Sequence, residues 1–288
     1  MASLILPLTI DIGLEPSLFK WGGLNITWHG LITALAIVAG VWVAVTLGKR
    51  FNYTEDDAYA VAVVGVFAGI VGARSLYVME NWRSMDMPWD AFRITEGGIS
   101  IWGAIIGGVG CGLAYGLWRR LVPWRGLDIG AMGLILGMAI GRVGCLLIGD
   151  TIAKASSLPW AVEYTNSDSA GWQRGPQHPA VAYEMIGDLL ILGIMALMVF
   201  RLRLKAGYAF ASMLILYSLM RFGVSYLRID SAFVIRHWIT VPQLVSIIGL
   251  AVGVLAAAVV RLRPAHWPEE PPPPGAALGP TAKEAPPP

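Results

Sequence analysis

The chain has 288 residues, of which 56% are hydrophobic and only 14% are charged. Soluble domains are about 45–50% apolar and about 25% charged, so this chain has too few polar residues to cover a soluble surface. A formal net charge of +2 without a long basic run excludes a nucleic-acid-binding protein. Cys111 and Cys145 both lie in apolar stretches, which excludes a disulfide framework and a CxxC metal site. The composition indicates an all-α membrane protein with several transmembrane helices.

Seven windows are long and apolar enough to cross a bilayer, which requires about 20 residues per helix. In chain order they are residues 28–47, 58–79, 97–118, 127–148, 180–200, 207–227 and 240–260. Glycines spaced four apart, such as Gly103 with Gly107 and Gly133 with Gly137, are typical of helices that pack closely in lipid. We therefore expect one transmembrane domain over residues 1–263, with a long loop over residues 149–179. Residues 264–288 contain ten prolines and predict a disordered tail.

The basic residues of the connections predict the orientation. The loops after the first, third and fifth windows are short, about 24 residues in total, yet they are rich in Lys and Arg. Their basic residues are Lys49, Arg50, Arg119, Arg120, Arg125, Arg201, Arg203 and Lys205. The connections on the other side hold seven basic residues over about 86 residues. Since cytoplasmic loops carry the excess of Lys and Arg, we expect the N-terminus outside and the C-terminus in the cytoplasm.

Ionisable residues inside a membrane span are costly and are functional candidates by default. Arg74, Arg142 and Arg221 fall in three different windows, each about 8–9 Å below the outer end at a rise of 1.5 Å per residue. Glu184 and Asp188 lie near the same level at i, i+4 spacing and are expected to pair with an arginine. Because arginine binds phosphate with a planar fork, this level predicts a site for an anionic headgroup or phosphate. The alternative is that these arginines snorkel to the headgroups.

Two further classes of site are not expected. The sequence has no His-His-carboxylate spacing typical of a metal site and no Gly-rich loop typical of a nucleotide site. The sequence therefore predicts no metal and no other cofactor.

Several strings, in order from about residue 25 to 260, resemble motifs of the prolipoprotein diacylglyceryl transferase family. The string Gly141-Arg142-Val143-Gly144-Cys145, followed by Gly149 and Asp150, resembles the Gly-Arg-x-Gly motif of that family. The remaining matches are Gly97-Gly98-Ile99-Ser100-Ile101, Trp28 with Gly30, Gly72-Ala73-Arg74 with Tyr77, the loop stretch from Leu158 to Val162 with Tyr164, His178-Pro179 with Tyr183-Glu184, Tyr217, Arg221, Arg228, Asp230, Gln243 and Ser246.

The resemblance implies a multi-pass enzyme of the bacterial plasma (inner) membrane that performs the first step of lipoprotein maturation. Such enzymes move the sn-1,2-diacylglyceryl group from phosphatidylglycerol to the lipobox cysteine thiol near the signal peptide of a preprolipoprotein, and glycerol-1-phosphate leaves. Arg142 and Arg221 are then expected to stabilise the departing phosphate. The residues expected to bind substrate are Arg74, Tyr77, Gly97, Gly98, Ser100, Trp102, Gly141, Gly144, Asp150, His178, Tyr183, Glu184, Tyr217, Arg228 and Gln243.

The sequence departs from the family at the position of a candidate base. Members commonly carry His where this chain has Trp102, and many carry Tyr where it has His29. A substrate thiol, with a pKa of about 8.5, needs help to form the nucleophilic thiolate. We hypothesise that His29 is the base that removes the thiol proton. The alternative is that His29 only forms hydrogen bonds at the membrane interface. Cys145 is interpreted as a packed small hydrophobe.

Two other functions remain open at this point. A diverged member of the family would bind anionic lipid or signal peptides without transferring anything. A carrier for an anionic solute would also place arginines inside a helical bundle. Carriers usually bind their solutes near the bilayer midplane between internal repeats, and this sequence shows no internal repeat.

Overall fold

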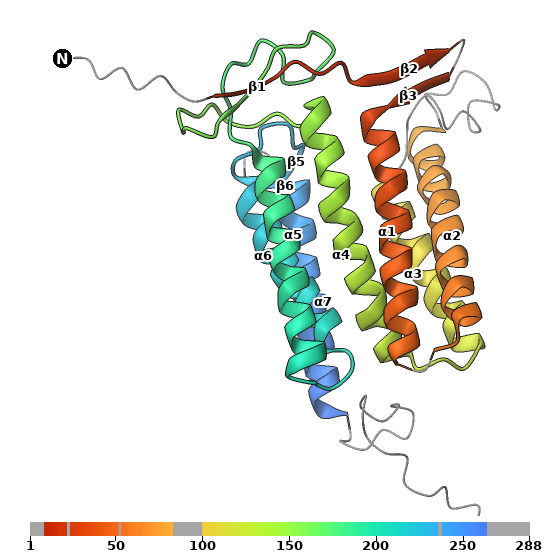
Figure 1. Ribbon diagram of the computed structural model, residues 1–288. Helices are drawn as coiled ribbons and strands as arrows, with labels where there is room; N and C mark the ends of the chain where they lie inside the picture. The colour runs from red at the N-terminus through yellow and green to blue at the C-terminus, as the bar shows by residue number, and fades with distance from the viewer. Residues whose placement is uncertain (1–8, 22–23, 52, 83–99, 236–237, 264–288) are drawn as a thin grey trace, which may run out of the picture.

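The computed structural model describes residues 9–21, 24–51, 53–82, 100–235 and 238–263. Within them it is a bundle of α-helices with small sheets at one end (Figure 1). The helices are α1 Trp28–Arg50, α2 Glu55–Asn81, α3 Ile101–Trp118, α4 Pro123–Ile148, α5 Ala180–Ala196, α6 Tyr208–Ser225 and α7 Val241–Leu262. A π-helical turn, Leu197–Arg201, continues α5. Each window predicted from the sequence overlaps one of these helices over most of its length. The Pro-rich tail and residues 97–99 of the third window lie outside the described residues.

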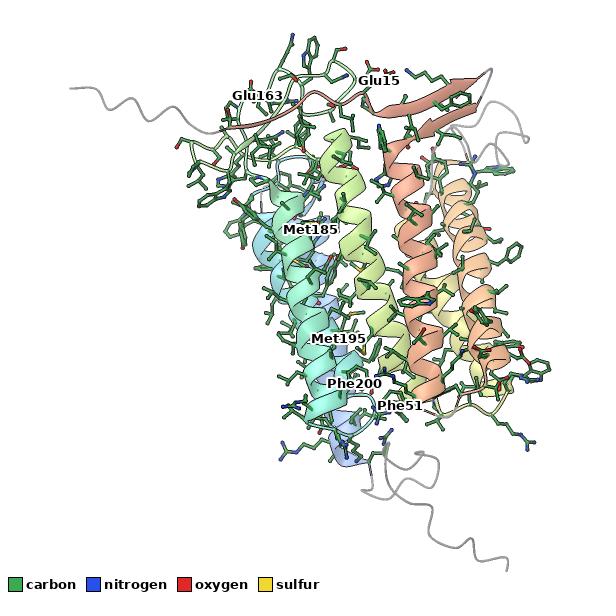
Figure 2. All side chains as sticks on the ribbon, viewed as in Figure 1. Glu15, Phe51, Glu163, Met185, Met195 and Phe200 are labelled. Carbon is green, nitrogen blue, oxygen red and sulfur yellow. The ribbon has the colours of Figure 1, made fainter. Side chains whose placement is uncertain are left out.

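Six of these helices are long and apolar enough to cross a membrane, and in α3 the apolar stretch Gly103–Trp118 is shorter. Side chains project from the outside of the bundle along its whole length (Figure 2). Many of them are large and apolar: Phe67, Ile106, Leu190 and Leu255 are 68%, 67%, 64% and 64% exposed. Apolar surface of this extent is unfavourable in water and favourable in lipid. The chain is a multi-pass membrane protein.

Glycines bring the helix backbones into contact. A Cβ atom on Gly133 of α4 would lie 2.5 Å from the carbonyl oxygen of Gly40 in α1. A Cβ on Gly103 of α3 would likewise meet the backbone of Gly72 in α2, and one on Gly107 would meet the carbonyl of Ala68. No side chain fits at these crossings. The close packing predicted from the glycine spacing is confirmed for these pairs.

Three two-stranded sheets lie at one end of the bundle, which we call the capped end (Figure 1). β1 Ile10–Ile12 pairs in parallel with β4 Val162–Tyr164, β2 Ser17–Trp21 pairs with β3 Leu24–Thr27, and β5 Phe233–Ile235 pairs with β6 Ile239–Thr240. The all-α expectation omitted them because strands of two to five residues are too short to give a clear alternating pattern. The short connections α1–α2, α3–α4 and α5–α6 lie at the opposite end.

The long connection between α4 and α5, residues 149–179, is fixed to the capped end. Gly149 ends α4 in the left-handed region with φ 65°. The ring of Tyr164 lies between Gly149 and Gly171, where a Cβ on either glycine would be 2.5 Å from the ring. The Tyr164 hydroxyl donates a 3.0 Å hydrogen bond to the carbonyl of Leu146. Burial raises the pKa of Tyr164 to about 12. This connection therefore covers the ends of the helices as an ordered cap.

Candidate functional site

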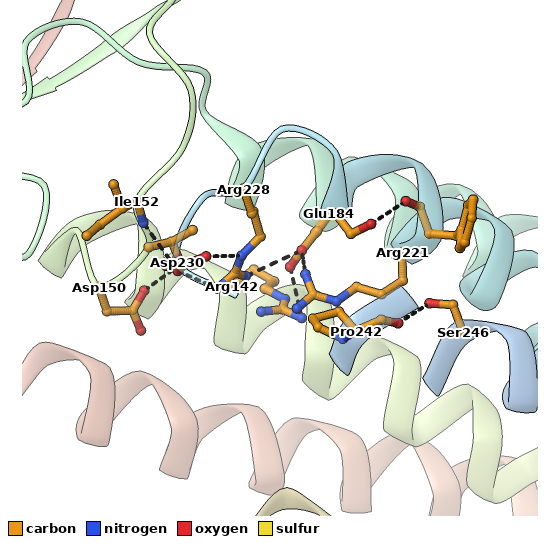
Figure 3. A network of polar contacts seen from close by, with 12 residues as sticks. Arg142, Asp150, Ile152, Glu184, Arg221, Arg228, Asp230, Pro242 and Ser246 are labelled. Atoms are coloured by element: carbon orange, nitrogen blue, oxygen red, sulfur yellow. Dashed lines mark hydrogen bonds and ion pairs between the residues drawn. The ribbon is translucent and has the colours of Figure 1, made fainter. Parts of the chain in front are cut away.

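Three arginines converge on one buried carboxylate near the capped end (Figure 3). Glu184 of α5 is 0% exposed. Its Oε2 lies 2.9 Å from Nη2 of Arg142 on α4, and its Oε1 pairs with Arg221 on α6. Nη1 of Arg228, which follows α6, lies 3.6 Å from the same Oε1. The pairing expected between Glu184 and an arginine is present, and it involves three arginines rather than one.

The third arginine is held by a second acid. Arg228 donates two hydrogen bonds to Asp230, from Nε at 3.0 Å and from Nη2 at 2.8 Å. Asp230 in turn accepts a 3.3 Å hydrogen bond from the backbone N–H of Ile152 in the long connection. This arrangement fixes Arg228 against both α5 and the cap.

The cluster carries an excess of positive charge. Three guanidinium groups contribute +3 and the two carboxylates that contact them, Glu184 and Asp230, contribute −2, which leaves +1. The side chains of Arg142, Arg221 and Arg228 remain 20%, 16% and 14% exposed. The guanidinium groups are therefore oriented by carboxylates and still accessible to an anion. Charge-assisted contacts of this kind suit a phosphate group.

Asp188 lies one turn deeper on α5 and does not form the expected pair. It is 0% exposed, and neither of its carboxyl oxygens has a hydrogen-bond partner among the described residues. It lies within electrostatic reach of Arg142 but forms no ion pair with it inside the described part of the chain. Since an unpaired buried polar group is costly, Asp188 belongs among the functional candidates.

A second group of polar side chains lies where α1 and α4 meet at the capped end. Nδ1 of His29 is 3.5 Å from Sγ of Cys145. One ligand atom each from His29, Cys145 and Asp150 all fall within 4.8 Å of one another. Gly144 permits this approach, because a Cβ there would lie 3.0 Å from Cα of His29. The sequence motifs point to His29, Cys145 and Asp150 separately. They do not predict that these residues meet, because 116 positions separate His29 from Cys145.

Some of the predicted substrate-binding residues lie elsewhere. Arg74 is on α2, with its guanidinium 5.3 Å from the centre of the Tyr77 ring. Ser100 is buried at the start of α3 and donates its N–H to Ala73. Gly97 and Gly98 lie outside the described residues, as does the side chain of Trp102. Because α2 and α3 pack mainly against each other, and α2 packs next against α1, this group belongs to the side of the bundle away from α5 and α6.

Other predicted residues have local partners. His178 and Tyr183 lie at the start of α5, with Nδ1 3.5 Å from the Tyr183 hydroxyl, which also accepts from Nε1 of Trp160 at 2.8 Å. Gln243 is buried, and its Oε1 accepts from the backbone of Thr240 in a capping box that starts α7. Tyr217 is one turn before Arg221 and interacts with Arg142. Gly141 lies open, since a Cβ there would have nothing within 4 Å.

Comparison with known proteins shows to which family the chain belongs. The family model described as prolipoprotein diacylglyceryl transferase matches residues 16–259. The phosphatidylglycerol–prolipoprotein diacylglyceryl transferase of Trichormus variabilis is 34% identical over 261 residues, covering 86% of this chain and 91% of that protein. The protein with the same name from Clostridioides difficile is 30% identical, covering 83% of this chain and 92% of that protein. The one from Dehalococcoides mccartyi is 31% identical, covering 88% of this chain and 96% of that protein. The resemblance seen in the motifs is confirmed, and the chain belongs to the prolipoprotein diacylglyceryl transferase family.

Proposed function

We propose that this protein transfers the sn-1,2-diacylglyceryl group of phosphatidylglycerol to the lipobox cysteine thiol of preprolipoproteins and releases glycerol-1-phosphate. The observation that carries the proposal is the convergence of Arg142, Arg221 and Arg228 on Glu184 in a chain of this family. The names of its relatives give both substrates, phosphatidylglycerol and prolipoprotein.

The arginine cluster suits the chemistry of the transfer. A thiolate displaces a phosphate ester from the glycerol carbon, so negative charge grows on the departing phosphate oxygen. Cationic groups fixed at that oxygen in a partly dehydrated site lower the energy of the transition state more than that of the bound lipid. Arg142 and Arg221 take this role, and Arg228 is assigned to headgroup contacts. Arg74, which lies beside Tyr77 on the side of the bundle away from α5 and α6, is not assigned to this phosphate. A phosphate is already a good leaving group, so the reaction requires no general acid.

The thiol needs a different partner. His29 lies at the capped end beside Cys145, which is one helical turn beyond Arg142 on α4. An imidazole at this position is close to the phosphate site and is able to promote loss of the thiol proton. With this assignment, His29 takes the place of the His that other members carry at the position of Trp102.

We further propose that all seven helices cross the membrane, with the capped end outside and the C-terminus in the cytoplasm of a bacterial cell. The 18 residues of α3 span about 27 Å at 1.5 Å per residue, close to the hydrocarbon thickness of about 30 Å. Lys and Arg are concentrated in the short connections opposite the cap, as the positive-inside rule requires of a cytoplasmic face. Residues 1–263 then form the catalytic domain and residues 264–288 a cytoplasmic tail.

The decisive experiment is a transfer assay with the purified full chain in detergent. Phosphatidylglycerol and a lipobox peptide with a free cysteine are supplied, and the peptide is followed by mass spectrometry while released glycerol phosphate is assayed. We expect the peptide to gain one diacylglyceryl group, and a peptide with Ser in place of the cysteine to gain none. Arg142→Ala should abolish the gain. Folded wild-type protein that binds phosphatidylglycerol but transfers nothing would instead establish a diverged lipid-binding member of the family.

A further inference from the structure

We infer that His29, Cys145 and Asp150 bind a divalent cation of the zinc class, and that the substrate thiol occupies the fourth coordination position of that ion. The inference rests on the proposed function, because it assigns a way of activating the thiol in that reaction. It also assigns a partner to Cys145, which the transfer mechanism otherwise leaves unused.

The distances fit a tetrahedral ion. Zinc bonds of about 2.0–2.1 Å to nitrogen and about 2.3 Å to sulfur place two ligands about 3.5 Å apart. Nδ1 of His29 and Sγ of Cys145 are 3.5 Å apart. The carboxylate of Asp150 completes a group within 4.8 Å. This residue is exposed, and the inference requires its side chain to turn toward the ion. The Thr151 hydroxyl donates to Oδ1 of Asp150 at 3.0 Å, which leaves Oδ2 for the ion.

Two of the three ligands, His29 and Cys145, are held at a close helix crossing. His29 is in the first turn of α1, whose N-terminus is capped by the hydroxyl of Thr27, which accepts from Gly30 at 3.0 Å. Cys145 is near the end of α4, and Gly144 brings that helix against the backbone of His29. Metal sites need donors that are held in place before the ion arrives. The close crossing of α1 and α4 provides this.

The donor set distinguishes a catalytic from a structural ion. Thiolate, imidazole and carboxylate together suit zinc. Structural zinc sites have four protein ligands, whereas catalytic sites have three and an open position. Here the described residues supply three. The two anionic ligands offset the +2 charge of the ion, which allows it to bind next to a cationic cluster. Cys111 on α3 is exposed and belongs to no such group within the described residues.

The open position has a use in this reaction. A thiol that coordinates zinc loses its proton, here to water at the capped end. The bound sulfur then attacks the glycerol carbon of phosphatidylglycerol. The S–C bond forms, the C–O bond breaks, and its electron pair leaves with glycerol phosphate at Arg142 and Arg221, while the ion stays divalent. Cys145 lies one helical turn beyond Arg142 on α4, so the proposed ion site is next to the proposed phosphate site. In this scheme His29 acts as a ligand rather than as a free base.

The first test observes coordination directly. Full-length protein is stripped of metal in detergent and loaded with Co²⁺, whose thiolate complexes absorb strongly in the near ultraviolet. We expect about one ion per chain and a sulfur-to-cobalt absorption that is lost in Cys145→Ser, weakened in His29→Ala and Asp150→Asn, and retained in the matched control Cys111→Ser. The lipobox peptide should strengthen the band, and its Ser counterpart should not. An unchanged band on adding the cysteine peptide would overturn the inference, whether or not transfer occurs.

The second test separates the inference from the proposed function. Chelation should lower the transfer rate by about tenfold or more, and added Zn²⁺ should restore it. Arg142→Ala should keep the cobalt band and lose transfer. Full transfer by metal-free protein would overturn the metal site and leave His29 as a free base in a working transferase. A responsive cobalt band without any transfer would instead overturn the proposed function alone.

Discussion

Arg142 and Glu184 join α4 to α5 through an ion pair whose Nη2 and Oε2 atoms are 2.9 Å apart (Figure 3). Glu184 is completely buried, and the same carboxylate also contacts Arg221 and Arg228. One carboxylate therefore contacts three arginines that come from two helices and a loop. A buried charge whose partners are removed is strongly destabilising, which makes Glu184 as important for folding as for the site.

Glu184→Gln should lower both stability and activity. The amide keeps the size of the side chain but leaves three guanidinium groups close together without their shared counter-charge. We expect the free energy of unfolding to fall by about 3–5 kcal/mol, the range for breaking a buried pair. Transfer should fall as well because the arginines lose their orientation. Unfolding of the detergent-solubilised variant and its rate in the peptide assay measure the two effects.

Glu15→Gln is the matched control for this substitution. Glu15 pairs with Lys20 at 3.1 Å, but its side chain is 59% exposed. Exposed pairs contribute little to stability, so this variant should unfold and react as the wild type does. Equal losses in the two variants would show that Glu184 is not the organising acid of the cluster.

Arginine-to-lysine changes test whether the fork of the guanidinium group matters. Arg142→Lys and Arg221→Lys keep the positive charge but lose the paired N–H groups that bind phosphate. We expect each to reduce the catalytic rate by about tenfold or more, with Arg142→Ala and Arg221→Ala lower still. Arg201, exposed at the opposite end of the bundle, provides the Lys and Ala controls, which should react normally. Comparable losses at all three positions in folded protein would place the phosphate elsewhere.

The sequence predicts the helices because each span is a continuous apolar window, and it predicts the level of Arg142 and Arg221 because helical rise is regular. It does not predict which helices are neighbours. The contact between His29 and Cys145 depends on the crossing of α1 and α4, and no local pattern marks a pair 116 positions apart. Arg228 joins the cluster only through the path of the loop after α6.

Asp128 is a second example of a residue whose partners cannot be predicted from the sequence. It lies inside the fourth predicted window but did not stand out as a candidate, and it is 1% exposed. Its carboxylate accepts hydrogen bonds of 2.8 Å from the backbone N–H groups of Gly207 and Phe210, so it caps the start of α6. Helix α6 has no side-chain cap of its own. The carboxylate that replaces it comes from another helix, and only the fold reveals it.

Gly133→Ala should separate α1 from α4. The new Cβ would lie 2.5 Å from the carbonyl oxygen of Gly40 and 3.3 Å from the Cβ of Ala44, so the helices must move apart. Overpacking of this kind costs about 1–3 kcal/mol. Because His29 and Cys145 face each other across the same crossing, transfer should fall with stability. Gly130→Ala on the same helix, where a Cβ has nothing within 4 Å, should leave both unchanged. If Gly133→Ala were as stable and active as Gly130→Ala, the contact at this crossing would not be required.

Tyr164→Phe tests how firmly the cap is attached. At neutral pH the variant loses the hydrogen bond to the Leu146 carbonyl, which should cost about 1 kcal/mol.

Burial raises the pKa of Tyr164 from 10.0 to about 12. Between these two pH values the unfolded chain loses a proton that the folded chain keeps, so wild-type stability should fall as the pH rises through this window. The variant lacks that group, so the stability advantage of the wild type over Tyr164→Phe should shrink and then reverse sign between pH 10 and pH 12. A rise of two pKa units corresponds to about 2.7 kcal/mol, which is more than the lost hydrogen bond costs. Tyr226, with 55% of its surface exposed, supplies a Tyr→Phe control for general effects of alkali. A difference that stays constant over this range would mean that Tyr164 ionises equally in both states and that the cap does not bury it.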